Sequence, residues 1–211
     1  MTGGAFLLLA LALVAAVLDW IAVDREAKAL EYLCKPLTLA LLLAAALALD
    51  PADASVRGWF ALALVLCLLG DVLLMLPQDL FVPGLVAFLF GHVAYIVGMH
   101  LDGVDAARAG VGVVLVLVAI ATLGRHILRA VGRSEEPELQ VPVLAYMAVI
   151  SVMVVSAIGT GHPAAIVGAG LFYASDSLIA WKRFVRSSRR GHLAVIVTYH
   201  LAQVGLVLSL L

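Results

Sequence analysis

Two aspartates, Asp71 and Asp176, lie inside long apolar stretches of the sequence. A carboxyl group in the middle of a membrane helix costs roughly 2.5–3.5 kcal/mol to insert, so each is a candidate for function unless a structural partner explains it. Burial disfavours the ionised form of a carboxyl group, and a second carboxyl nearby adds repulsion. We therefore expect one acid to hold a proton while the other stays ionised, the division of roles that hydrolysis of an ether or acetal uses.

The two aspartates are expected at one depth in the membrane. Each lies five residues before the end of its apolar segment, near Leu76 and Trp181 respectively. At 1.5 Å per residue, both lie about 7–8 Å below the same surface. Other polar residues reach this layer or lie deeper, and their convergence predicts one polar pocket shared by both acids: Lys35, His92, Tyr95, Tyr146, Tyr199 and Gln203.

Each of these residues also has a structural explanation. A membrane aspartate can serve only to hydrogen-bond a neighbouring helix. A histidine such as His92 can do the same, and a buried tyrosine needs only one partner for its hydroxyl. No pair of histidines or cysteines has the spacing of metal ligands, so we predict no metal site.

The elements that carry these residues are predicted to be membrane helices. Of the 211 residues, 64% are apolar and 13% are charged, against roughly 45–50% and 25% in globular proteins, which excludes a water-soluble domain. Eight segments approach the ~20 residues that span a bilayer, and none alternates as a barrel strand does. The fold class predicted is an all-α integral membrane protein, a single domain over 1–211, with helices at about 4–23, 33–49, 59–76, 80–100, 108–127, 139–158, 163–181 and 192–211.

Basic residues indicate the orientation of these helices. Eleven of the 13 lysines and arginines follow odd-numbered segments, and only Arg57 and Arg108 lie at the other ends. Because loops rich in lysine and arginine stay in the cytoplasm, both termini are expected on the opposite side, and the pocket is expected to open toward the cytoplasmic leaflet. The first segment is expected to remain as a helix, since no basic residue precedes it. The run from Lys182 to Arg190 is interpreted as an orientation signal that meets anionic headgroups, not as a substrate site.

The sequence also suggests a weak internal repeat. Residues 70–74 resemble residues 175–179, and Pro36 and Pro142 precede Asp71 and Asp176 by 35 and 34 residues. A four-plus-four repeat of this kind gives two parallel halves with a site between them. The alternative is chance recurrence of short Asp-Leu patterns in leucine-rich helices.

The net charge of −1 and the lack of a glycine-rich phosphate loop predict no nucleic-acid partner.

A set of motifs in helices two to eight resembles the YhhN-type lysoplasmalogenase family. The motifs are Lys35-Pro36, Leu69 to Met75, Gly84-x-x-x-Phe88-x-x-x-His92-x-x-Tyr95, Pro142-Val143-x-x-Tyr146, Phe172-x-x-Ser175-Asp176-Ser177 and Tyr199-x-x-x-Gln203. The resemblance implies an eight-helix hydrolase of the bacterial inner membrane. It would cleave the vinyl ether bond of a lysoplasmalogen to a fatty aldehyde and glycerophospho-ethanolamine or -choline, with a lysophospholipid as substrate, membrane lipid around it and no cofactor.

The resemblance also implies roles for individual residues. Asp71 and Asp176 would be the catalytic pair, one delivering a proton to the vinyl ether carbon and the other stabilising the oxocarbenium ion and orienting water. Lys35 would pair with the substrate phosphate or with the ionised aspartate. The remaining substrate-binding candidates are His92, Tyr95, Tyr146, Ser175, Tyr199 and Gln203.

Two other classes of function stay open from the sequence. A transporter or lipid-handling protein could use the same acids to bind a proton or cation during alternating access, and the repeat favours it. A structural or partner-binding membrane protein needs neither acid for chemistry. A serine hydrolase is disfavoured, because no Gly-x-Ser-x-Gly motif is present.

Overall fold

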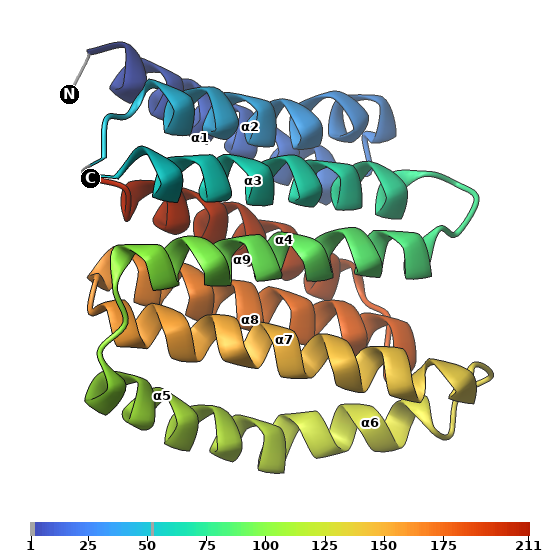
Figure 1. Cartoon of the computed structure of the whole chain (residues 1–211). Coiled ribbons are helices and arrows are strands. Elements are labelled where there is room, and N and C mark those ends of the chain that lie inside the picture. The colour runs from blue at the N-terminus through green and yellow to red at the C-terminus, as the bar shows by residue number, and fades with distance from the viewer. Residues whose placement is uncertain (1–2, 52) are drawn as a thin grey trace.

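The computed structural model describes residues 3–51 and 53–211. Eight helical spans cross the bundle side by side, and the chain reverses at each end (Figure 1). The described residues contain no strand, so the predicted all-α membrane fold with eight spans is confirmed. The elements are α1 (Gly3–Asp24), α2 (Lys28–Ala48), α3 (Ala54–Met75), α4 (Phe81–Asp102), α5 (Ala106–Ala119), the π-helical turn η1 (Ile120–Gly124), α6 (Arg125–Val131), the 3-10 turn η2 (Pro137–Leu139), α7 (Gln140–Thr160), α8 (Pro163–Phe184) and α9 (Arg189–Leu208).

Local capping explains where several helices begin and end. Side chains of Asp53, Asp105 and Ser188 accept hydrogen bonds from backbone N–H groups in the first turns of α3, α5 and α9. Pro163 takes the first position of α8, where its missing N–H costs nothing, and Gly161 ends α7 at a φ of 76° that favours glycine.

The second helix is longer than its apolar segment. It begins at Lys28 rather than near residue 33, and Lys28 Nζ lies 2.7 Å from Glu31 Oε2 within its first turn. This ion pair lets a polar turn extend the helix beyond the apolar run. Pro36 consequently lies inside α2.

Neighbouring helices pack as antiparallel pairs, and contacts between these pairs join them into one bundle. The pairs α1·α2, α3·α4 and α8·α9 each share long interfaces, while α4 packs on α7, and α9 packs on both α1 and α2. In α8·α9 the backbones meet at Gly168, where an added Cβ would lie 2.9 Å from the carbonyl oxygen of Ala202. This close approach holds Asp176 and Tyr199 on adjoining helices.

The span made of α5, η1 and α6 is peripheral. It lies at the edge of the bundle in Figure 1 and packs chiefly on α7, with α6 also touching α8. Its outer face exposes valine and leucine side chains, as a surface facing lipid does. The suggested four-plus-four repeat stays a prediction, since α1 packs on both α2 and α9 while α5 packs mainly on α7.

One end of the bundle is called here the basic end. It consists of the four connections 25–27, 76–80, 132–136 and 185–188, and both chain termini lie at the other end (Figure 1). Arg183 ties three of its elements together, with its guanidinium 2.9 Å from Asp79 Oδ1 and 2.8 Å from Glu136 Oε1. The candidate site lies just inside this end.

Candidate active site

Asp176 is held by two side chains from other helices, a tyrosine and a histidine. Tyr146, on α7, donates its hydroxyl to Asp176 Oδ2 at 2.5 Å, and His92, on α4, lies with Nε2 3.0 Å from the same oxygen. His92 Nε2 is also 2.9 Å from the Tyr146 hydroxyl oxygen. Three helices thus bring one carboxylate, one phenol and one imidazole together.

The hydrogen bonds assign the tautomer of His92. Because the Tyr146 proton points to Asp176, the Nε2 atom of His92 carries the proton that it shares between Tyr146 and Asp176. The Nδ1 atom is buried and has no hydrogen-bond partner among the described residues. Phe172 packs edge-on against this ring, with 4.6 Å between the two centroids.

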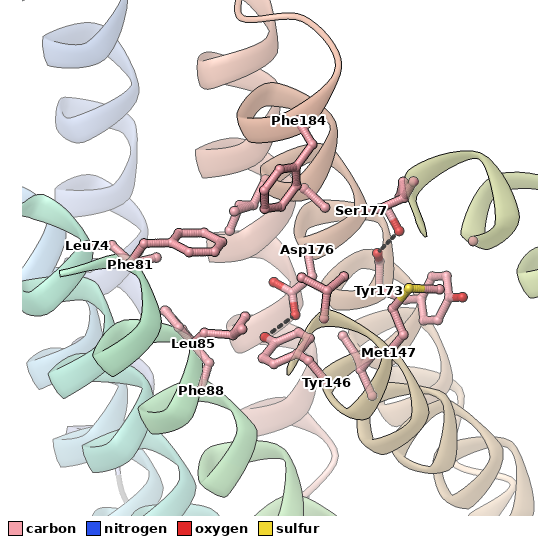
Figure 2. Close-up of a pocket in the computed structure, with 16 residues that line it drawn as sticks. Leu74, Phe81, Leu85, Phe88, Tyr146, Met147, Tyr173, Asp176, Ser177 and Phe184 are labelled. Carbon is pink, nitrogen blue, oxygen red and sulfur yellow. Dashed lines mark hydrogen bonds between the residues drawn. The ribbon is translucent and has the colours of Figure 1, made fainter. Parts of the chain in front are cut away.

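Asp176 lies at the wall of an apolar cavity, which Figure 2 shows in close-up. The cavity encloses about 660 Å³ of empty volume including its mouth. In Figure 2 the carboxyl group of Asp176 and the ring of Tyr146 lie together between apolar side chains from α3, α4, α7 and α8. The side chain of Asp176 is 8% exposed, and within the described ranges nothing hydrogen-bonds its Oδ1 atom. One carboxyl oxygen is therefore left for a molecule in the cavity.

Asp71 has a different environment. Its Oδ1 lies 3.0 Å from the ammonium of Lys35 on α2, and its Oδ2 accepts a hydrogen bond of 2.7 Å from Tyr199 on α9. Asp71 is 1% exposed. It lines neither the apolar cavity beside Asp176 nor the second cavity that adjoins it toward the basic end. Both of its oxygens are occupied by protein groups.

An aromatic layer separates the two carboxylates. The ring of Phe172 lies 4.6 Å from that of His92 and 5.4 Å from that of Tyr199, and Phe88 packs on Phe172 and Tyr199 as well. The structure therefore differs from the expected single pocket shared by both acids. Equal depth along two helices does not fix the direction in which their faces point, and here α3 and α8 direct their acids to different neighbours.

A second cavity adjoins the first on the side of the basic end. Both are lined by Leu74, Phe81 and Ile179, which form the boundary between them. The lining residues of the second cavity surround about 1160 Å³ of space, open solvent included, and they combine apolar side chains with titratable ones: Lys28, Glu31, Lys35, Asp79, Lys182, Arg183 and His192. An apolar chamber with one acid thus opens beside a polar chamber.

Three other predicted site residues bond elsewhere. Tyr95 donates to Gln203 Oε1 at 2.6 Å, which ties α4 to α9, and Gln203 Nε2 has no partner among the described residues. Ser175 donates its hydroxyl to the backbone oxygen of Val195 at 3.0 Å. The structure brings none of the three to the wall of either cavity, and a role for them in substrate binding stays a prediction.

Several buried polar residues were missed in the sequence. Asp19 on α1 is fully buried, and neither of its oxygens has a hydrogen-bond partner within the described residues. Its position carried a signal, because it lies five residues before the end of α1 at Asp24, much as Asp71 and Asp176 lie near the same end of their segments. Nearby, Trp20 Nε1 donates to His200 Nδ1 at 3.1 Å.

The donor set at these sites does not resemble a metal centre. In residues 3–51 and 53–211, no three histidine, cysteine, aspartate or glutamate side chains gather in a way that could hold a metal ion. The arrangement at Asp176 is instead that of an acid with two hydrogen-bond donors on one oxygen and an apolar chamber at the other. Such a group can transfer a proton to a bound apolar molecule and take it back.

Comparison with known proteins finds relatives over most of the chain. The model of the YhhN family matches residues 30–210. Lysoplasmalogenase TMEM86B of Homo sapiens is 34% identical over 149 residues, covering 71% of this chain and 62% of the relative. Lysoplasmalogenase of Mycobacterium bovis is 33% identical over 175 residues, covering 79% and 65%. The chain thus spans less than two thirds of the length of these relatives, and no solved structure matches it.

Proposed function

The chain belongs to the YhhN family, and from that premise we propose that it is a membrane hydrolase that cleaves the vinyl ether bond of lysoplasmalogens. The products would be a fatty aldehyde and glycerophospho-ethanolamine or -choline. The observation that carries the proposal is Asp176, held through Oδ2 by Tyr146 and His92 with Oδ1 free at the wall of an apolar cavity. The relatives named lysoplasmalogenase support it.

In the first step, Asp176 acts as general acid. A proton on Oδ1 moves to the vinyl ether carbon distal to oxygen, the carbon–carbon double bond opens, and an oxocarbenium ion forms next to the new carboxylate. Negative charge develops on Asp176 as the proton leaves, and Tyr146 and His92 already donate to Oδ2, where that charge is shared. Preorganised donors of this kind stabilise the transition state without reorganisation.

In the later steps, the same carboxylate acts as general base. Oδ1 takes a proton from water as the water oxygen adds to the oxocarbenium carbon, which gives a hemiacetal. Asp176 then returns that proton to the ether oxygen while it accepts the proton of the hemiacetal hydroxyl, and the carbon–oxygen bond breaks to aldehyde and alcohol. One acid completes the cycle with water as the only co-reactant.

Asp71 supports this site from a distance in the proposal. Its ion pair with Lys35 and its hydrogen bond from Tyr199 hold α2, α3 and α9 together behind the aromatic layer. We assign Lys35 to this ion pair, one of the two roles that the sequence allowed, and not to the substrate phosphate. Asp71 is then a positioning residue, and its removal is expected to destabilise helix packing rather than to remove a group that reacts with the substrate.

Aldehyde release from purified protein tests the proposal. The protein in maltoside detergent is incubated with a 1-alkenyl lysophospholipid, its 1-acyl analogue and its 1-alkyl ether analogue. We expect aldehyde only from the alkenyl lipid, without any ion gradient or added cofactor. Absence of aldehyde, or transport of unchanged lipid by the reconstituted protein, would contradict the proposal and support the transporter alternative.

The basic end is proposed to face the cytoplasm of a bacterium, with the protein in the inner membrane. Eleven of the 13 lysines and arginines lie toward this end, in its connections or in the adjoining helices, and such basic segments resist translocation. Single cysteines introduced in residues 132–136 should be shielded from a membrane-impermeant thiol reagent added to intact cells. Since Cys34 and Cys67 are buried, they give little background.

A further inference from the structure

The charged cavity at the basic end has one cation without a counter-ion. Lys28 pairs with Glu31 and Lys35 pairs with Asp71, whereas Arg183 pairs with Asp79 and Glu136. In the part of the chain that the structure describes, Lys182 forms no salt bridge, although it is partly buried and lines this cavity. Of the lysines and arginines that line this cavity, Lys182 is therefore the one with no ion-pair partner among the described residues.

The position of Lys182 relative to Asp176 matches the length of a lipid headgroup. Both residues are on α8, six residues apart, which is a rise of about 9 Å toward the basic end. Ile179 lies between them and lines both cavities. A vinyl ether at Asp176 with its chain in the apolar cavity directs the three-carbon glycerol past Ile179, and its phosphate arrives beside the ammonium of Lys182.

We infer that the charged cavity binds the phosphodiester of the lysophospholipid, with Lys182 as its ligand. This inference deepens the proposed function and rests on it for the identity of the lipid. The ammonium of Lys182, which has no ion-pair partner among the described residues, can pair with the negative charge of the phosphodiester, and the flexible stem of Lys182 lets the ammonium reach it. The inference changes the interpretation of the basic run from Lys182 to Arg190, whose first residue is a substrate ligand and not only an orientation signal.

Surroundings of Lys182 favour an anion over a cation. Lys182 also lines a cavity at the start of α9 together with Ser188 and His192. The two acids in that lining, Glu26 and Glu31, are paired with Arg189 and Lys28. The N-terminal end of a helix carries partial positive charge, which adds to that of the lysine. The acids lining the charged cavity, Glu31 and Asp79, are each paired with a cation of the protein, and Asp79 shares Arg183 with Glu136.

Equilibrium binding tests this inference independently of turnover. The ligands are a radiolabelled 1-alkyl lysophosphoethanolamine, whose ether bond lacks the double bond, and the 1-alkylglycerol that lacks phosphate. Maltoside detergent is used because it carries no phosphate. We expect wild-type protein to bind the phosphate-bearing lipid about tenfold more tightly than the alkylglycerol, the loss typical of one hydrogen bond to a charged group.

Variants of Lys182 and of Arg190, a second residue of the same basic run, test whether Lys182 is the ligand. Lys182→Gln should weaken binding of the lysophospholipid about tenfold and leave binding of the alkylglycerol at its wild-type value, while Lys182→Arg should keep most of the affinity. Arg190→Gln is the matched control, since Arg190 belongs to the same basic run and lines neither cavity. Equal binding of the lysophospholipid by wild type and Lys182→Gln would overturn the inference.

Two further measurements distinguish a lipid site from a site for free phosphate, and a failure of the headgroup site from a failure of the proposed hydrolase. If inorganic phosphate displaces the lysophospholipid at concentrations comparable to that of the lipid itself, the site recognises free phosphate and the lipid assignment is wrong; displacement only at far higher phosphate concentrations supports it. Aldehyde release is measured on the same preparations. Phosphate-selective binding without turnover refutes the hydrolase alone, and turnover without phosphate selectivity refutes the headgroup site alone.

Discussion

Two carboxylates at similar depth in one bundle have opposite surroundings. Asp71 meets a cation and a phenol, and protein groups occupy both of its oxygens. Asp176 meets a phenol and an imidazole on one oxygen, and the other oxygen has no partner among the described residues and lies at the wall of an apolar cavity. A buried ion pair with both carboxylate oxygens occupied suits a structural role, whereas an acid with a free oxygen and a space beside it can react.

The comparison is tested most strongly by Asp176→Asn. The amide keeps the shape of the side chain but cannot deliver or accept the proton, so kcat for aldehyde release should fall by about 10²–10⁴-fold. The temperature of thermal unfolding in detergent should change little, because Tyr146 can still donate to the amide oxygen. Undiminished turnover in this variant would remove Asp176 from the chemistry.

Asp71→Asn should chiefly lower stability. It leaves the ammonium of Lys35 buried without its carboxylate, and removing one partner of a buried ion pair costs about 3–5 kcal/mol. The double variant Lys35→Met, Asp71→Leu replaces the pair by apolar groups and should recover much of the unfolding temperature and turnover. If the double variant is as stable as wild type but fails to release aldehyde, Asp71 takes part in catalysis and the comparison fails.

The two tyrosines offer a matched pair of substitutions. Tyr146→Phe removes a donor to Asp176 and should lower kcat by about 10²-fold, as loss of one preorganised donor does. Tyr199→Phe removes a donor to Asp71 and should cost about 1.5–3 kcal/mol of stability with kcat near that of wild type. Turnover of both variants is compared after each has been checked for monodispersity; equal losses of kcat would show that the two clusters act as one.

The sequence placed both acids toward the same end of the bundle but did not give their partners. Apolar segments of bilayer length placed eight spans, and distance from the segment ends placed Asp71 and Asp176 near one surface. These quantities depend on position along a helix. The partner of each acid depends on rotation of the helix and on its neighbours, which a single sequence in leucine-rich helices records weakly, so the expectation of one shared pocket differed from the structure.

Residues at the edges of apolar segments were the hardest to assign. Lys182 begins a basic run that orientation explains by itself, and only the packing of α8 beside α9 shows that it lines a cavity. Asp19 lies four residues before the end of the predicted segment 4–23, close to the charged residues Asp24 and Arg25, and it was not singled out from the sequence. Its complete burial comes from contacts of α1 with α2 and α9, which involve distant parts of the chain.

Asp19 extends the comparison to a third acid, for which the smallest effect is expected. It has neither the cation of Asp71 nor the donors of Asp176, so Asp19→Asn breaks no hydrogen bond seen among the described residues. Stability should stay within about 1 kcal/mol of wild type, since a neutral polar group of the same shape replaces an unpartnered acid. Thermal unfolding and aldehyde release are measured together, with Asp71→Asn as the destabilised reference. A loss of turnover above tenfold at unchanged stability would show that an acid can act in this bundle without a visible partner, and pairing would then no longer distinguish reactive acids from structural ones.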